Sequence, residues 1–174
     1  FFELLKTSEN LPKTSQIPPI MFEDAFKDAC EKGDDVVCIT MSSALSGTYN
    51  NAVLAADSVR DDYPDREIFV IDSLQASVGI IIQALYAAEL VRFGNSAAQT
   101  AEAVTKMQKK IRIMALLDTL KYVKKGGRIS GAAATIGGLL SIKPVVSIDE
   151  YGKLVVIGKA RGSANGHNLL KMNV

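Results

Sequence analysis

The sequence predicts an α/β fold: a parallel sheet flanked by helices, followed by the start of a second α+β domain with an antiparallel hairpin. Two short runs rich in β-branched residues, Val36–Thr40 and Ile68–Ile71, alternate with helical segments, which is typical of a parallel sheet covered on both faces. Farther along, Pro144–Ile148 and Leu154–Gly158 are separated by a turn around Asp149–Gly152. A connection this short forces the two strands to run antiparallel.

Hydrophobic periodicity locates the remaining elements. The predicted helices are, in chain order, Phe1–Lys6, Met21–Glu31, Thr48–Asp61, Ser77–Phe93, Ala97–Lys110, Thr119–Lys125 and Ala132–Leu140. Thr7–Pro19 is a loop because prolines punctuate it, and Ser96 can cap the helix that follows it. We predict Ile111–Leu117 as a third strand of the parallel sheet. Ser77–Phe93 is apolar almost all round, so we expect it to be sandwiched in the core.

The change from parallel units to a hairpin predicts two domains. We expect residues 1–118 to form the α/β domain and residues 119–174 to begin a second α+β domain. The chain starts inside one predicted helix and ends inside another. We therefore expect an incomplete portion of a longer protein, without the N-terminal strand of the first domain.

Charge and cysteine content exclude several classes of protein. The chain has 20 basic and 19 acidic residues and a net charge of +1, which argues against nucleic acid as a partner because phosphate binding needs a basic face. Cys30 and Cys38 fit no metal or disulfide pattern, so we expect a reducing, cytoplasmic compartment. The longest apolar stretch is broken by Gln83 and Glu89 and is too short to span a bilayer.

No catalytic set is visible in the sequence. His167 is the only histidine, and no Cys–His or Ser–His–Asp arrangement can be built around it. The paired carboxylates Asp61 and Asp62 lie at a polar helix end, where solvation explains them. We therefore expect a binding protein that is not an enzyme and that carries neither a metal nor a cofactor of its own.

The richest candidate site is Ser42–Thr48, between the strand Val36–Thr40 and the next helix. Ligands of open α/β sheets bind outside the carboxyl ends of the strands, where a helix N-terminus offers free N–H groups. Ser46 and Thr48 add hydroxyl donors, and Gly47 permits a close approach to the backbone. This pattern predicts a site for a carboxylate or phosphate. The alternative is that Ser46 or Thr48 is only an N-cap.

Three other polar stretches are weaker candidates. Thr14 and Ser15 could add donors to the same anion, or belong to a plain turn. Asp72–Ser73 ends the strand Ile68–Ile71 at the same sheet edge, and could line the pocket or cap a helix. Lys124–Arg128 could cradle a phosphate, or be a solvated basic helix end; it lacks the spacing of a P-loop.

Seven stretches of the chain match the motifs of one known family, in the same order and over nearly the whole chain. They are Phe1–Ser8, Leu11–Gln16, Met41–Tyr49, Asp72–Ser73 with Ser77 and Gly79, Asp118–Ser130, Leu139–Pro144 and Lys159–Gly162. Together they resemble the DegV family of bacterial fatty-acid-binding proteins. Asp118–Ser130 is the most specific stretch, and seven motifs in order rarely arise by chance.

The resemblance implies a function and a set of site residues. It implies that the protein binds a long-chain fatty acid such as palmitate and presents it to a separate fatty acid kinase, which phosphorylates the acyl carboxylate. By the same resemblance, Thr14 and Ser46 bond the carboxylate, Ser15 and Thr48 are neighbours, and Arg128 lies near the head group or the kinase contact. Neutral hydroxyls suit this role because a buried fixed cation is costly to desolvate.

The acyl tail requires an apolar slot, for which Phe22, Ile80, Ile81 and Leu85 are candidate walls; core packing is the alternative for each. Each buried methylene contributes roughly 0.8 kcal/mol, so the tail should dominate affinity and the head group should set orientation. Ile17 and Ile81 stand where the family usually has Pro and Gly, which predicts an altered chain-length preference.

The family pattern also extends beyond both ends of this chain. Its opening strand, with an Asp-Ser motif, would precede Phe1, and a later segment with a histidine near the head group would follow Val174. We therefore expect an exposed sheet edge and an incomplete cleft in this chain.

Two other classes of function remain open. An α/β enzyme acting on a phosphorylated small molecule would use the helix terminus at Ser46 and the Lys125–Arg128 loop as two phosphate sites. A pure protein-interaction domain predicts a closed core without an elongated pocket.

Overall fold

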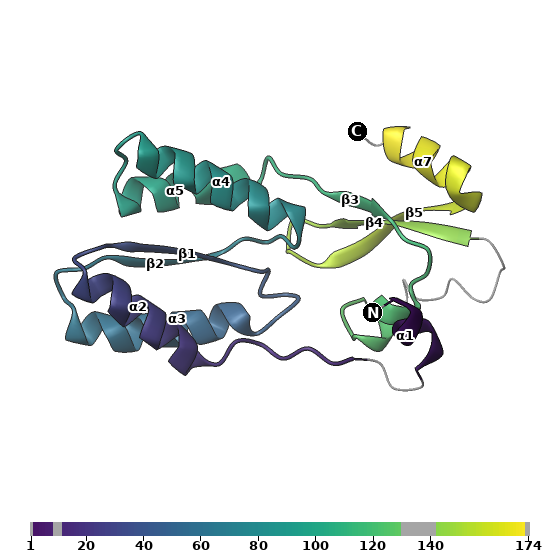
Figure 1. Cartoon of the computed structure of the whole chain (residues 1–174). Helices are drawn as coiled ribbons and strands as arrows, with labels where there is room; N and C mark the ends of the chain where they lie inside the picture. The colour runs from purple at the N-terminus through teal and green to yellow at the C-terminus, as the bar shows by residue number, and fades with distance from the viewer. Residues whose placement is uncertain (1, 9–11, 130–141, 173–174) are drawn as a thin grey trace.

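The computed structural model describes residues 2–8, 12–129 and 142–172 (Figure 1). Its elements in chain order are α1 (Phe2–Thr7), α2 (Pro19–Glu31), β1 (Val36–Thr40), α3 (Thr48–Asp62), β2 (Ile68–Asp72), α4 (Val78–Arg92), α5 (Ala97–Gln108), β3 (Met114–Leu116), α6 (Lys121–Lys125), β4 (Ile142–Ile148), β5 (Leu154–Arg161) and α7 (Gly162–Met172). The α/β class predicted from the sequence is confirmed. The predicted helix Ala132–Leu140 lies outside the described residues.

The first sheet is the predicted parallel pair. β1 and β2 pair in parallel, in a register that runs from Val36 opposite Ile68 to Thr40 opposite Asp72. Helices α2 and α3 cover one face, and α4 and α5 cover the other (Figure 1). Among the described strands, β1 and β2 pair only with each other, so the other edge of each is unpaired.

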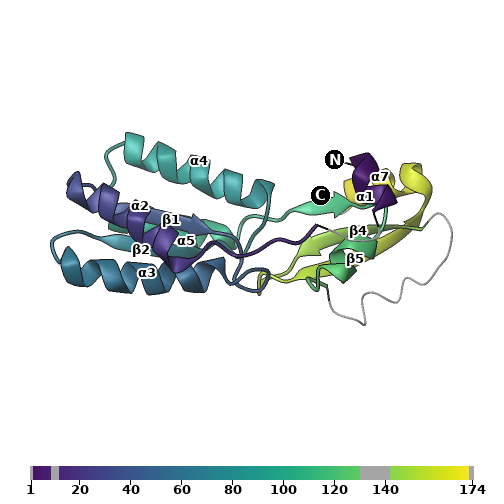
Figure 2. The ribbon, with the colours of Figure 1, turned by 60° about the horizontal axis from the view of Figure 1, so that its bottom comes forward.

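The second sheet corrects one sequence prediction. Ile111–Leu117 was expected as a third parallel strand, but β3 pairs antiparallel with β4, with Leu116 opposite Val145. β4 and β5 form the predicted hairpin. The order β3-β4-β5 makes a separate sheet that lies end to end with the first (Figure 2). β3 precedes residue 118 and yet belongs to this second sheet; the division of the chain into folding domains at that residue stays a prediction.

The core of the first unit is made where α3 packs on the sheet. Ala55, Ala56 and Val59 have no exposed surface, and they meet Phe26 of α2 and Ile68 of β2. The small alanine side chains allow the helix to approach the strands closely, so the larger Phe26 fills the space between the helices.

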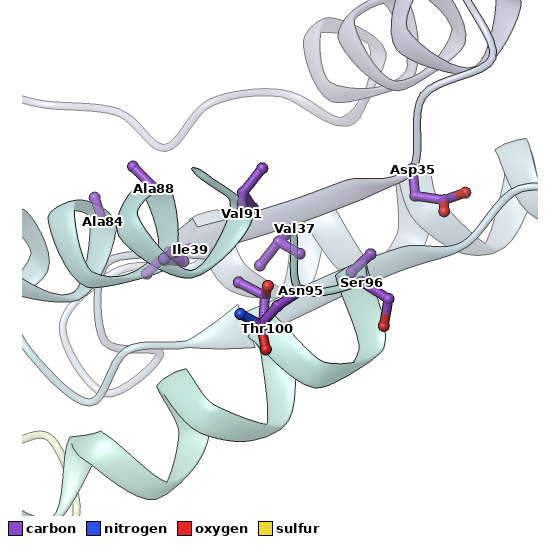
Figure 3. A pocket seen from close by; sticks show the side chains of 11 residues that line it. Asp35, Val37, Ile39, Ala84, Ala88, Val91, Asn95, Ser96 and Thr100 are labelled. Atoms are coloured by element: carbon purple, nitrogen blue, oxygen red, sulfur yellow. The ribbon is translucent and has the colours of Figure 1, made fainter. Parts of the chain in front are cut away.

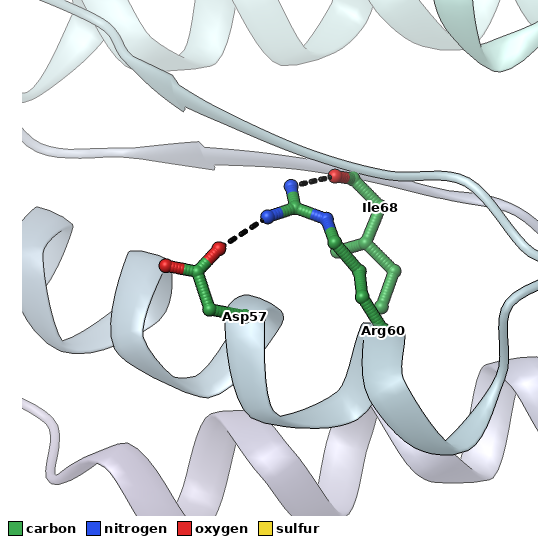
Figure 4. Close-up of polar contacts among 3 residues, drawn as sticks. All are labelled: Asp57, Arg60 and Ile68. Carbon is green, nitrogen blue, oxygen red and sulfur yellow. Dashed lines mark hydrogen bonds and ion pairs between the residues drawn. The ribbon is translucent and has the colours of Figure 1, made fainter.

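Arg60 joins α3 to the start of β2 (Figure 4). Its guanidinium donates to the Ile68 carbonyl and, at 2.5 Å, to the carboxylate of Asp57 one turn earlier. The side chain is partly exposed, so the ion pair itself contributes little. Its main effect is to satisfy a strand carbonyl at the edge of the core.

Helix α4 is placed differently from the expectation. The sequence predicted that Ser77–Phe93 would be sandwiched in the core, but α4 buries only one stripe, Gly79, Gln83 and Ala87. Its opposite face exposes large apolar side chains, including Ile81 and Leu85 at 56% and 64%. A helix that is apolar all round could be buried on every side. In this structure α4 packs on the two-stranded sheet with one face only, so its other faces stay exposed.

Helix α5 follows its prediction closely. It is closed by a capping box, in which the Ser96 hydroxyl accepts the Gln99 N–H and the Gln99 side chain accepts the Ser96 N–H. This arrangement satisfies two N–H groups that would otherwise lack partners. No helix within the described ranges is long and apolar enough to cross a bilayer.

Cys38 on β1 provides a chemical test of the packing. Burial raises the pKa of its thiol from 9.0 to about 11. At about pH 8 the reactive thiolate should therefore be about a hundredfold rarer than for an unshifted thiol. We expect iodoacetamide to alkylate Cys38 about a hundredfold more slowly in the folded protein than in concentrated urea, as followed by peptide mass spectrometry. Equal rates in the two conditions would show that β1 is open to solvent.

Candidate functional site

The candidate site lies where the loops after β1 and β2 meet. Because the strands are parallel, both loops leave the same edge of the sheet. The Ser42 N–H donates to the Gln75 carbonyl at 2.9 Å, and the Ser43 N–H donates to Asp72 Oδ1 at 3.1 Å. Asp72 thus braces the two loops and does not cap α4. These bonds hold the Ser42–Thr48 loop in a fixed position.

Ser46 and Thr48 form a hydroxyl pair at the start of α3. Their oxygens are 2.8 Å apart, and Ser46 Oγ also accepts the Thr48 N–H at 3.2 Å. The N-cap position is held by Gly47, which makes no side-chain cap. The pair shares one hydroxyl hydrogen, so the second hydrogen is left as a donor for another group. Simple capping therefore does not account for both hydroxyls.

The segment carrying Thr14 and Ser15 runs in extended form past this helix start. Gln16 packs so closely on Gly47 that a Cβ added to Gly47 would lie 1.9 Å from Gln16 Oε1. Asn51 Nδ2 of α3 donates to the Ile17 carbonyl at 2.7 Å. The lack of a side chain at Gly47 therefore makes room for the Gln16 side chain, and not for a ligand as the sequence had indicated. The result is that Thr14 and Ser15 lie beside Ser46 and Thr48, although they are far apart in the sequence.

One pocket of about 430 Å³ contains all four hydroxyl residues. It is lined by Thr14 and Ser15 from the extended segment and by Ser46 and Thr48 from the loop after β1. Arg128 lines the same pocket from the segment that follows α6. The spacing of these three segments along the chain does not predict their contact, which the tertiary structure brings about.

Arg128 is the cation of this pocket. Its Nε donates to the Leu45 carbonyl at 3.2 Å, its Nη1 donates to the Gly126 carbonyl at 2.5 Å, and the side chain is exposed. The guanidinium has five N–H donors, so it keeps donors for an anion at the mouth of the pocket. The hydrogen bond to the Leu45 carbonyl joins the segment after α6 to the Ser42–Thr48 loop. Lys125, named with it as a second phosphate site, does not line the pocket.

A sequence model of the DegV family, whose members it describes as uncharacterised proteins, matches residues 1–171.

The chain belongs to the DegV family.

A DegV domain-containing protein of Streptococcus pyogenes serotype M3 is 40% identical over 151 residues, which is 87% of this chain and 53% of that relative. One from Clostridium perfringens strain 13 is 35% identical over 160 residues, or 92% of this chain and 55% of the relative. The chain therefore spans about half the length of these curated DegV relatives.

Solved structures share the fold. A DegV family protein from Thermus thermophilus, described for its fatty acid binding, is 32% identical with a TM-score of 0.83, over 98% of this chain and 59% of that one. The Fatty Acid Kinase (Fak) B3 protein of Streptococcus pneumoniae, solved loaded with linoleic acid, is 30% identical with a TM-score of 0.84, over 97% and 58%. Both confirm the arrangement of a parallel pair followed by an antiparallel sheet.

The four residues predicted to wall the acyl cleft of this DegV chain do not line the hydroxyl pocket. Phe22 packs beside Phe26 between α2 and the core, with ring centroids 5.8 Å apart. Ile81 and Leu85 are exposed on α4, and Ile80 is partly buried there. A role for these four residues as walls of an acyl cleft therefore stays a prediction, and it would require a cleft apart from the hydroxyl pocket.

The apolar walls that the structure does provide were missed. Met41 and Leu45 come from the loop after β1, and Ile148 and Leu154 come from the two strands of the hairpin. Ile148 and Leu154 are opposite each other in the β4–β5 ladder, at the turn. No local signal identified them, because both belong to a sheet that the sequence placed apart from the binding loops.

A second pocket of about 570 Å³ lies between α4, α5 and β1 (Figure 3). Small and branched apolar side chains line it, among them Val37, Ile39 and Ala84, and the fully buried Thr100 hydroxyl has no partner there. None of the predicted head-group residues reaches this pocket. Within the described ranges, no cluster of three metal-ligating side chains is present either.

Proposed function

We propose that this protein binds a long-chain fatty acid such as palmitate and presents it to a partner fatty acid kinase. The observation that carries the proposal is the convergence of four hydroxyl residues, from two separate segments, on one pocket with apolar walls. The hydroxyls of such a pocket can donate hydrogen bonds to a carboxylate. Its apolar walls can contact the methylenes of the fatty acid that follow the carboxylate. The protein supplies the bound acid and has no catalytic role of its own.

In this proposal Thr14 and Ser46 donate to the carboxylate, and Ser15 and Thr48 support them. The spare hydrogen of the Ser46–Thr48 pair is one donor. The start of α3 adds the positive end of a helix dipole, since α3 is a full helix from Thr48 to Asp62. These groups stabilise a single negative charge without burying a cation, which would be costly to desolvate.

We propose that the acyl tail runs from this pocket along one face of the second sheet. Leu154 lines the pocket and also packs against an apolar cluster around Leu120, Ile129 and Val146. Val156, two residues along the same strand, belongs to that cluster. The tail would lie against the partly buried side chains of Leu154 and Val156, and each methylene it buries would contribute roughly 0.8 kcal/mol.

Arg128 and the partner kinase belong to the same proposal. The Arg128 guanidinium lies in the pocket lining and remains exposed, so a kinase bound there would meet it beside the carboxylate. The Streptococcus pneumoniae relative supports this reading, because it is named a Fatty Acid Kinase (Fak) B3 protein and was solved loaded with linoleic acid. The rival enzyme with two phosphate sites is less well supported, because Arg128 and Ser46 line one pocket.

Lipid extraction tests the proposal directly. The protein is purified in its natural full length from a bacterial host, extracted with organic solvent, and the extract is analysed by mass spectrometry. We expect about one long-chain fatty acid per protein, and titration of delipidated protein with palmitate should show saturable binding. Protein that carries no lipid, ignores palmitate and binds phosphate esters instead would overturn the proposal in favour of the enzyme.

A further inference from the structure

The turn of the β4–β5 hairpin packs against the loops that follow β1 and β2, at the carboxyl end of the parallel sheet. Ser42 Oγ donates a hydrogen bond of 2.8 Å to the Gly152 carbonyl, between residues 110 positions apart in the chain. Gly152 has a φ of +74°, and a Cβ there would lie 2.1 Å from Ser42 Oγ and 3.3 Å from the Leu74 Cα. Both the backbone conformation and the lack of space require glycine at this position.

Ser42 is bonded through all of its polar groups. It is fully buried, and its N–H donates to Gln75. Its carbonyl accepts the N–H groups of Leu45 at 3.0 Å and Ser46 at 3.1 Å. Its hydroxyl oxygen accepts the Ala44 N–H at 3.2 Å while it donates to Gly152. The Ser42 hydroxyl thus hydrogen-bonds both to the loop that carries Ser46 and to the turn of the hairpin.

The hairpin turn is held rigid on its own side. Asp149 Oδ1 accepts the N–H groups of Tyr151 at 3.0 Å and Lys153 at 2.8 Å. Ile148 and Leu154 flank this turn and line the head-group pocket. A shift of Gly152 away from Ser42 would therefore carry the apolar wall away from the hydroxyl wall.

We propose that Ser42 is a positioning residue that fixes the distance between these two walls of the fatty-acid site. The inference rests on the proposed function, since it concerns the same pocket. A fatty acid must place its carboxylate on the Ser46 loop and its first methylenes against Leu154 at the same time. Holding the two walls in register before the ligand arrives lowers the cost of binding and slows release of the ligand.

The test uses Ser42→Ala in the full-length, delipidated protein with palmitate as the probe. We expect palmitate affinity to fall about tenfold, mainly through faster dissociation, because one buried hydrogen bond no longer joins the walls. Hexadecanol has a similar tail without a carboxylate, and its affinity should fall less. The preference for palmitate over hexadecanol should therefore shrink, which a purely structural role for Ser42 would not produce.

Thr40→Val is the matched control. Thr40 is buried at the end of β1, two residues before Ser42. Its hydroxyl donates to the Ile71 carbonyl at 3.2 Å and not to the hairpin. This variant should lose comparable stability and keep the palmitate affinity of the wild type. If it loses as much affinity as Ser42→Ala, the effect is general destabilisation and the positioning role is wrong.

The remaining outcomes are separable. A wild-type protein that does not bind palmitate contradicts the proposed function itself. A wild-type protein that binds, together with a Ser42→Ala protein that binds equally well, overturns only the positioning role. Should Ser42→Ala fail to fold, Ser42→Cys keeps a similar side-chain volume with a weaker donor, and the same loss of affinity and preference is expected for it.

Discussion

Replacing Thr14 and Ser46 together with alanine is expected to weaken palmitate binding about 100-fold. A hydrogen bond to a charged group contributes about 1.5–3 kcal/mol, so two such bonds at the lower figure contribute about 3 kcal/mol, close to two factors of ten. Both side chains line the pocket, Thr14 is exposed and Ser46 half-buried, and neither belongs to the core clusters. The fold should therefore survive. Isothermal titration with palmitate measures the change.

Ser43→Ala is the control for this prediction. Ser43 lies in the same loop and is exposed, but its side chain is not part of the pocket lining. Its backbone N–H, which bonds Asp72, is unaffected by the substitution. We expect wild-type affinity for this variant. Unchanged affinity of the Thr14→Ala, Ser46→Ala protein would mean that the carboxylate binds elsewhere, and Arg128 would be the next residue to test.

Replacing Phe26 with alanine is expected to lower the free energy of unfolding by about 3–5 kcal/mol. Phe26 is only 4% exposed and fills the space between α2, α3 and β2. Its neighbours Ala55 and Ala56 are too small to close the resulting cavity. Domains are typically stable by about 5–15 kcal/mol, so this loss would remove a large part of the total. Urea titration followed by circular dichroism measures it as a shift in midpoint.

Phe93→Ala supplies the comparison for the Phe26 variant. Phe93 follows α4, is 72% exposed, and its ring has the guanidinium carbon of Arg92 at 5.3 Å. Removing it should cost no more than about 1 kcal/mol, since an exposed cation–π contact contributes little. A large loss from Phe93→Ala, or a negligible one from Phe26→Ala, would contradict the packing described for this unit.

Local sequence signals predicted the elements well. The strands β1 and β2, the hairpin of β4 and β5, and the Ser96 cap of α5 all follow from residue types and spacing within short windows. The loop at Ser46 was also identifiable, because a strand followed by a hydroxyl-rich, glycine-containing loop and a helix has a known geometric consequence. The family resemblance then selected Thr14 from an otherwise plain turn.

Long-range pairing was beyond these signals. The short strand β3 carries no mark that tells a parallel neighbour from an antiparallel one, and its partner Val145 lies far along the chain. Helix α4 looked like a core helix because periodicity measures composition and not the surface available to cover. For the same reason, periodicity did not indicate that Phe22 of α2 and Ile81 of α4 lie outside the hydroxyl pocket.

The sequence by itself determined the class of fold, the order of its elements and the loop that carries the hydroxyls, because these depend on interactions between residues close in the chain. The family resemblance implied that Thr14, Ser46 and Arg128 lie near one head group, and the tertiary structure shows that they line one pocket. The tertiary structure alone decided that Leu154 supplies the apolar wall of that pocket. It also brought the Gly152 carbonyl within hydrogen-bond distance of the Ser42 hydroxyl. Contacts of this kind join segments separated by many residues, and they form only when whole elements pack against one another.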